Sequence, residues 1–263
     1  MSQSRPMRAI LTYHSIDRSG SPISVHPDVF EGHVRWLASG AVRTMTLDDL
    51  MTAGGDEDAV AVTFDDGFSN FATEAVPRLI ERGVPATLFV VTDHVGRTNE
   101  WRGQGDPGVP TLPLLDWADL GHLAGLGVAI GAHTRTHASL ACLSAAEVED
   151  EVGGSAERLR SELGIDARSF AYPYGSLSDA AVHAARRFAW SCTTEFRVLG
   201  GHEDAALLPR LDMYYFGLGW PLTAWGAPTF RAYIAARRTL RRCRGWMDRE
   251  PRVERALVAG SRC

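Results

Sequence analysis

Two carboxylates stand side by side in the segment Thr63-Phe-Asp-Asp-Gly67, after an apolar run and before a glycine that permits a tight turn. At such a turn the side chains of Asp65 and Asp66 can both point into one site. One carboxylate would ligate a metal ion while its neighbour acts as a general base. A plainer interpretation is a helix start, because aspartate is favoured there and Asp-Gly marks turns. The pair alone leaves both interpretations open.

Two histidines follow in Gly131-Ala-His-Thr-Arg-Thr-His137. Imidazoles at this spacing can reach one metal ion from a single turn. With one carboxylate, His133 and His137 would form a set of two histidines and one acid that leaves coordination positions open for water and substrate. An isolated pair is a weak signal, because both rings could make local hydrogen bonds instead. The paired aspartates favour a metal site as the interpretation of the two histidines.

The third element is Arg168-Ser-Phe-Ala-Tyr-Pro-Tyr-Gly175. Arg168 begins an apolar segment, and a charge that becomes buried needs a partner. A carboxylate that is not on the metal would serve as that partner. The turn Pro173-Tyr174-Gly175 would then present a backbone N–H to the site. The alternative is an ordinary strand-ending turn with a surface arginine.

These residues must be positioned by an alternation of strands and helices. Apolar runs predict strands at 9–13, 59–64, 86–91, 128–132, 169–172 and 190–194, and amphipathic runs predict helices at 28–39, 70–82, 117–124, 145–163 and 179–188. Repeated units of this kind imply a single α/β domain with a parallel sheet inside and helices outside. A closed or nearly closed (β/α) barrel is the economical arrangement.

Polar residues fall just beyond the carboxyl ends of the expected strands. In a parallel barrel these ends share one face, which is where active sites form. The residues concerned are His14, Asp65, Asp66, His133 and Tyr174. The sequence therefore predicts that groups far apart along the chain meet at one barrel mouth.

The three motifs, in this order and spacing, resemble those of the polysaccharide deacetylases of carbohydrate esterase family 4, the NodB-homology domain. The resemblance covers about positions 9 to 215 and implies a distorted (β/α) barrel that removes acetyl groups from amino-sugar nitrogen. It implies that Asp66, His133 and His137 hold a divalent metal, commonly zinc, with cobalt, nickel or manganese as alternatives. It also implies that Asp65 is the general base, that Arg168 orients it, and that the Tyr174 N–H helps to stabilise the oxyanion.

The sequence departs from the family pattern at the general acid. Well-known members have a Leu-x-His near the carboxyl end, whereas the matching segment Leu208-Pro-Arg-Leu-Asp-Met213 has no histidine. His14 is the candidate, because Leu11-Thr-Tyr-His-Ser-Ile16 is similar to the Tyr-His of the branch that acts on poly-N-acetylglucosamine. The alternative for His14 is a structural hydrogen bond at the barrel mouth. His202, in a loop-like stretch, is a weaker candidate.

A Gly/Pro-rich insertion between Gly103 and Pro113 is bordered by Asn99 and Trp101. Long loops at the mouth shape substrate pockets, and tryptophan suits stacking on a sugar ring. We therefore expect substrate contacts from Asn99, Trp101 and Pro173. Packing of the loop onto the barrel is an equally good explanation for the tryptophan.

Composition narrows the class of protein. The chain has 263 residues, 45% hydrophobic and 22% charged, which is globular composition. A net charge of -5 argues against a nucleic-acid partner, which requires a clustered basic surface. The four cysteines are scattered without metal-ligand spacing and are expected to be unpaired thiols.

Charge is uneven along the chain. We divide the chain into a lead at 1–8, a catalytic barrel at 9–228 and an arginine-rich helical tail at 229–263. Basic amphipathic helices can lie on anionic membranes, so the tail is a candidate for peripheral membrane contact, although a helix packed on the barrel is the commoner case. With no apolar export signal or membrane span in the sequence, we expect a cytoplasmic protein, at the inner membrane face if the tail binds there.

Three functions are compatible with these observations. The first is an N-deacetylase acting on an intracellular or lipid-linked amino-sugar glycan. The second is hydrolysis of a non-sugar amide or cyclic imide, since fold does not determine substrate. The third, a binding protein without catalysis, is disfavoured by the intact Asp and His set.

Overall fold

Eight parallel strands form the central sheet of the computed structural model, which describes residues 6–217 and 220–247. The strands are β1 (Arg8–Tyr13), β4 (Arg43–Met45), β5 (Ala59–Phe64), β6 (Ala86–Val90), β7 (Ala129–Ala132), β8 (Ser169–Ala171), β9 (Trp190–Cys192) and β10 (Leu211–Asp212), and β2 (Ser15–Ile16) pairs separately with β3 (Ser24–Val25). Their order is β10-β1-β5-β6-β7-β8-β9. β4 and β6 both pair with β5, β4 along its first half and β6 along its second.

The segment 208–212 joins the two edges of the curled sheet. Leu208 forms a parallel bridge with Cys192 at the end of β9, and β10 pairs with β1 through Leu11 and Leu211. The strands are apolar because both of their faces are covered, as is usual for parallel sheets. The predicted fold, a single α/β domain with a distorted barrel, is confirmed.

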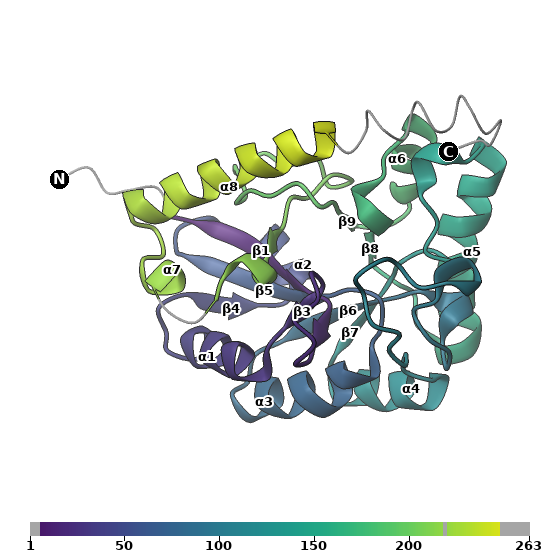
Figure 1. Ribbon diagram of the computed structural model, residues 1–263, viewed down its shortest axis with the longest axis horizontal. Helices are drawn as coiled ribbons and strands as arrows, with labels where there is room; N and C mark the ends of the chain where they lie inside the picture. Colours follow the sequence, from purple (N-terminus) through teal and green to yellow (C-terminus); the bar gives the residue numbers. More distant parts are fainter. Residues whose placement is uncertain (1–5, 218–219, 248–263) are drawn as a thin grey trace.

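Helices cover the outside of the sheet (Figure 1). They are α1 (Pro27–Leu37), α2 (Leu47–Thr52), α3 (Val76–Glu81), α4 (Trp117–Gly125), α5 (Ala145–Leu163), α6 (Asp179–Ala185), α7 (Trp220–Thr223) and α8 (Pro228–Met247). α5 begins with a reciprocal cap between Ser144 and Glu147 and ends at Gly164, whose φ of 68° suits glycine. The short elements β4, α2 and β10 were not predicted, because runs of two to six residues show too little periodicity.

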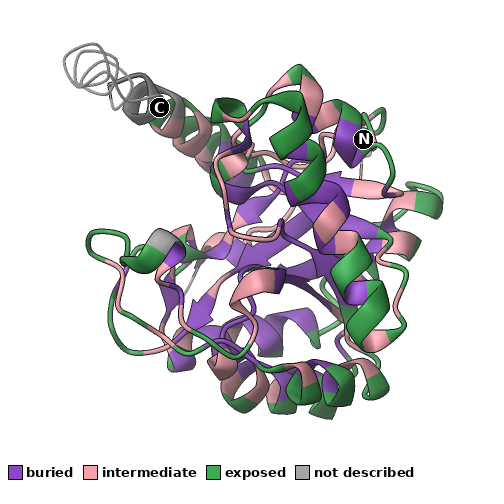
Figure 2. Cartoon of the chain, turned by 90° about the vertical axis from the view of Figure 1, so that its right-hand side faces the viewer, coloured by how far each residue is buried: buried purple, intermediate pink, exposed green. Residues whose placement is uncertain are grey.

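The barrel interior is narrow and filled by alternate residues of the strands. The inner apolar cluster is small and comprises chiefly Ile10, Ala59, Ala61, Phe89, Ala171, Cys192 and Leu208. A Cβ at Gly131 would lie 2.6 Å from the Phe89 ring, so only glycine fits there. A larger cluster fills the space between sheet and helices, and Figure 2 shows buried strands inside a shell of helices with exposed outer surfaces.

Helix α8 packs on the barrel through Phe230 and Ile234, which are buried. Arg238 pairs with Glu195, Arg241 lies 3.1 Å from Asp212, and the Arg237 guanidinium stands 5.0 Å from the centre of the Tyr215 ring. These three arginines are therefore engaged with the barrel. Residues 248–263 of the predicted tail lie outside the described residues. Among the helices described, none has the length and apolar character to cross a membrane.

Candidate metal centre and active site

Three buried side chains converge at the carboxyl ends of β5 and β7. Oδ1 of Asp66 lies 3.3 Å from Nε2 of His133 and 3.3 Å from Nε2 of His137. One ligand atom from each residue can be chosen so that all lie within 4.8 Å of one another. The structure thus brings together the three residues predicted to hold a metal.

The hydrogen bonds of these residues favour a cation between them. Nδ1 of His133 lies 2.8 Å from the carbonyl oxygen of Ala171, which places the proton on Nδ1 and turns the Nε2 lone pair toward Asp66. Oδ1 of Asp66 is buried, and no donor among the described residues meets it with hydrogen-bond geometry. Burial lowers the pKa of His137, which favours its neutral, ligating form. Two imidazoles and one carboxylate fit zinc, with an open position for water.

Without a bound cation, the pKa of His133 is raised above its usual value, whereas that of His137 is lowered. Burial would lower the pKa of His133, but the adjacent carboxylate of Asp66 and the charge of Asp65 raise it. A bound divalent cation repels that proton, because an ion in the site is the largest local charge. Proton and metal therefore compete for His133.

The backbone at the site is unusual. In the described chain the non-glycine residues with left-handed φ are Asp66, Thr134, His137 and Tyr174, at φ 73°, 65°, 60° and 58°. Each such residue costs about 1–2 kcal/mol. All four lie at or beside the three candidate ligands, and strain of this kind clusters at functional sites.

Asp65 is held by Arg210, a residue that sequence reasoning missed. Nη1 and Nη2 of Arg210 lie 2.6 and 2.7 Å from Oδ1 and Oδ2 of Asp65, and both side chains are buried. Arg210 also donates to the carbonyl of Thr193 and the hydroxyl of Thr12 at 3.0 Å each. Burial would raise the pKa of Asp65, but the charge and hydrogen bonds of Arg210 hold it below its usual value. The carboxylate therefore stays ionised and ready to accept a proton.

The prediction that Arg168 orients Asp65 is wrong. Arg168 precedes β8, at the opposite end from the barrel mouth, and its side chain is 65% exposed. Its Nε donates to Oδ2 of Asp48 at 2.7 Å, so the alternative of a surface arginine was correct. The signal for Arg210 was available in 208–213: an arginine within an apolar run needs a buried partner.

His14 lies at the barrel mouth beside Asp65. Its Nε2 is 3.8 Å from Oδ2 of Asp65, and its side chain is 26% exposed. Tyr174 also lines the cavity, with its ring centre 4.5 Å from that of His137 and its hydroxyl 3.5 Å from Oδ2 of Asp106. The structure thus places both predicted residues at the site, while their catalytic roles stay predictions.

A cavity of about 110 Å³ opens above the three candidate ligands. It is lined by His14, Ile23, Asp65, Asp66, Phe68, Asn99, Trp101, Asp106, Val109, His133, His137, Tyr172, Tyr174 and Thr194. Trp101 is buried, and its ring centre lies 4.5 Å from that of His137.

Two of the predicted substrate contacts, Asn99 and Pro173, differ from expectation. The amide of Asn99 donates to the Pro110 carbonyl at 3.0 Å and accepts from the Leu112 N–H at 2.7 Å, so it ties the insertion together. Pro173 is buried in the turn that carries Tyr174 and does not line the cavity, so the expected substrate contact is not found there.

Comparison with known proteins decides the family. The family model for polysaccharide deacetylases matches residues 52–191, more than half of the chain. The chain belongs to the polysaccharide deacetylase family. The resemblance stated from the motifs is thereby confirmed.

Two curated relatives within this family are similar over most of the chain. YxkH of Bacillus subtilis strain 168, named as a polysaccharide deacetylase, is 26% identical over 71% of this chain. A Staphylococcus aureus poly-beta-1,6-N-acetyl-D-glucosamine N-deacetylase is 25% identical over 73% of it. The matched segments span 64% and 66% of these two relatives, less than two thirds of either.

Solved structures share the barrel of this deacetylase-family chain. IcaB from Ammonifex degensii superposes with a TM-score of 0.67 at 24% identity, covering 87% of this chain and 97% of that one. Streptococcus pyogenes deacetylase PplD, solved with acetate, gives 0.67 at 20% identity, covering 79% and 92%. At these identities the likeness concerns the fold.

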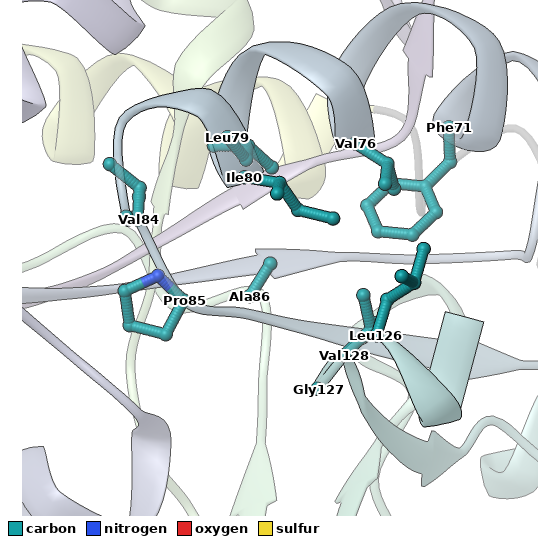
Figure 3. A pocket seen from close by; sticks show the side chains of 11 residues that line it. Phe71, Val76, Leu79, Ile80, Val84, Pro85, Ala86, Leu126, Gly127 and Val128 are labelled. Atoms are coloured by element: carbon teal, nitrogen blue, oxygen red, sulfur yellow. The ribbon is translucent and has the colours of Figure 1, made fainter. Parts of the chain in front are cut away.

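A second cavity lies away from the candidate metal centre, between α3 and the turn that precedes β7 (Figure 3). It is lined by Phe71, Val76, Leu79, Ile80, Gly83, Val84, Pro85, Ala86, Leu126, Gly127 and Val128. None of these side chains can ligate a metal or transfer a proton. The smaller, polar cavity above Asp66 is therefore the candidate active site.

Proposed function

We propose that this protein is a metal-dependent N-deacetylase that hydrolyses the acetamide of an N-acetylated amino sugar in a glycan. One observation carries the proposal: Asp65, kept ionised by Arg210, lies in the same cavity as the set of Asp66, His133 and His137. The similarity to a relative named for poly-beta-1,6-N-acetyl-D-glucosamine supports the substrate class.

Asp66, His133 and His137 would hold the divalent metal, zinc first among the alternatives. When bound, such a cation lowers the pKa of a water molecule and polarises the amide carbonyl. Asp65 accepts a proton from the attacking water as general base. Its two hydrogen bonds with Arg210 fix the orientation of the carboxylate, so that little reorganisation is needed during the reaction.

The remaining steps require a hydrogen-bond donor and an acid. The turn at Tyr174 borders the cavity, and its backbone N–H would stabilise the oxyanion. The amine leaving group needs a proton, and His14, which lies at the edge of the cavity beside Asp65, would supply it. The ring of Trp101 forms an apolar wall against which a pyranose face could stack.

The finer proposal is an intracellular or lipid-linked glycan intermediate, handled in the cytoplasm at the inner membrane face. It rests on the sequence between Arg231 and Arg262, which holds ten arginines against Asp248, Glu250 and Glu254. Vesicles containing anionic lipid should float with the full chain and lose it when residues 248–263 are deleted. Flotation of neither protein removes the membrane part, whereas equal flotation of both shows that residues 248–263 are not needed for the contact.

Acetate release from the zinc-loaded protein tests the main proposal. Nucleotide-linked, lipid-linked and oligomeric N-acetyl sugars are compared with cyclic ureides and simple acetamides. We expect acetate from at least one N-acetyl sugar, and no release from the Asp65→Asn variant with its zinc content unchanged. Turnover confined to ureides or simple amides would overturn the sugar assignment.

A further inference from the structure

Glu151 of α5 is a buried carboxylate aimed at the loop between the two metal-site histidines. Its exposed fraction is 8%. Oε2 accepts from the backbone N–H groups of Arg135 and Thr136 at 2.9 Å each, and Oε1 accepts from the Thr136 hydroxyl at 2.6 Å. Hydrogen bonds to an ionised acceptor are about twice as strong as neutral ones.

The loop that Glu151 binds has a strained backbone at both ends. Thr134 and His137 have left-handed φ values of 65° and 60°, and the residues that Glu151 binds lie between them. The Thr134 hydroxyl accepts from the His137 N–H at 3.0 Å, and the Asp93 N–H donates to the Arg135 carbonyl at 2.9 Å. These contacts hold the two ends of the loop, whereas Glu151 accepts hydrogen bonds from the two N–H groups in the middle.

Helix α5 is pressed directly against this loop. A Cβ on Gly154 would lie 2.7 Å from Cδ of Arg135, so the helix approaches the arginine stem as closely as glycine allows. Arg135 is also held from outside by Asp93 and Asp150, at 2.9 and 2.7 Å. The loop is therefore clamped between α5 and the segment after β6.

We propose that Glu151 is a positioning residue of the metal centre. By fixing the backbone of Arg135 and Thr136, it holds the strained loop in the conformation that turns Nε2 of His137 toward Asp66. His133 is aligned separately, through its bond to the Ala171 carbonyl. This inference rests on the proposed metal centre, and it concerns affinity for the ion rather than the chemical step.

The test compares zinc affinity, measured by competition with a chromophoric chelator, among full-length variants. Outer-shell partners of metal ligands are worth about 10–100-fold in affinity. We expect Glu151→Ala to weaken zinc binding by about that factor. Glu151→Gln should stay within about threefold of wild type, because its carbonyl can accept both N–H groups while the Thr136 hydroxyl reverses its role. Glu157→Ala, on the exposed side of the same helix, is the matched control.

A purely structural role is separated by two further readouts. Cobalt-loaded Glu151→Ala should show altered d–d absorption, which reports ligand geometry, while Glu151→Gln keeps the wild-type spectrum. Thr136→Val removes only the 2.6 Å bond and should weaken zinc binding severalfold, which decides the matter if Glu151→Ala does not fold.

The inference is overturned if Glu151→Ala binds zinc within twofold of wild type. If that variant does not fold, the same result in Thr136→Val overturns it. Either result leaves the proposed function standing. Absence of zinc binding by the wild-type protein would remove the proposed metal-dependent function itself.

Discussion

Arg210 and Asp65 face each other through two parallel hydrogen bonds of 2.6 and 2.7 Å, although 145 positions separate them in the chain. Asp65 follows β5, and Arg210 belongs to the segment 208–212 that joins the edges of the sheet. The orientation of the proposed base therefore depends on how the barrel closes. Both side chains are buried, so each charge is balanced chiefly by the other.

Replacement of Arg210 by methionine should affect both activity and stability. Removing one partner of a buried pair costs about 3–5 kcal/mol, because the other charge is left uncompensated. We expect kcat/KM for acetate release to fall by about 100-fold or more as Asp65 loses its orientation. The exposed Arg168→Met variant should keep kcat/KM within about twofold of wild type. Equal losses in both variants would contradict the assignment.

Stability and activity should separate in the double variant Asp65→Asn with Arg210→Met. Neutralising Asp65 removes the unpaired buried charge that Arg210→Met creates, so we expect recovery of most of the lost unfolding free energy. Activity should stay absent, because no base is present. Urea denaturation of the two single variants and the double variant measures the coupling, and strictly additive losses would count against a direct pair.

Metal removal should abolish turnover and reversibly lower thermal stability. A ligand present at 100 times its Kd stabilises the folded state by about 2.7 kcal/mol. Dialysis against a chelator should lower Tm by several degrees, and equimolar zinc should restore both Tm and acetate release. His137→Ala should show no zinc-dependent rise in Tm, whereas the exposed His122→Ala should respond like wild type. A wild-type Tm that ignores zinc would contradict the site.

His14 should matter for leaving groups that need a proton. General acid catalysis contributes about 10²–10⁴-fold, so His14→Ala should lose about that much kcat on N-acetyl sugars while it retains zinc. With 4-nitrophenyl acetate, whose phenolate leaves unprotonated, the variant should approach wild-type rates. Near-full turnover of the amide would remove His14 from the role, and equal losses on both substrates would point to a structural effect.

His33 should make the protein less stable in acid. Its Nδ1 lies 3.1 Å from the Tyr13 hydroxyl and its Nε2 2.6 Å from the Phe216 carbonyl, and burial lowers its pKa from 6.5 to about 4. Between these values the unfolded chain binds a proton that the folded protein does not. Stability is therefore full above pH 6.5 and falls as the pH drops toward 4, by up to about 3 kcal/mol.

The variant His33→Gln tests this dependence, with the exposed His122→Gln as control. Unfolding free energies of the zinc-free proteins are measured by urea denaturation from pH 7 to 4.5. We expect a flatter dependence in His33→Gln only. Parallel curves for all three proteins would assign the acid sensitivity to other groups.

The strands, the helices and three of the chemical groups could be predicted from the sequence because their signals are local. The run 59–64 and the helix 145–163 were placed with the bounds that the structure has, since their periodicity and caps lie within each segment. Asp66, His133 and His137 follow the carboxyl ends of parallel strands, and strand direction alone brings those ends to one face.

The same rule excludes Arg168, which precedes its strand and so lies at the far end of the barrel. Tertiary structure alone decided that Arg210 holds Asp65, because the pairing depends on how the short segment 208–212 meets both β9 and β1. It also decided that Asn99 binds its own loop and lines the cavity together with Trp101. A residue's type and its neighbours in the chain specify which interactions it can make, whereas the closed barrel determines which partner comes within reach.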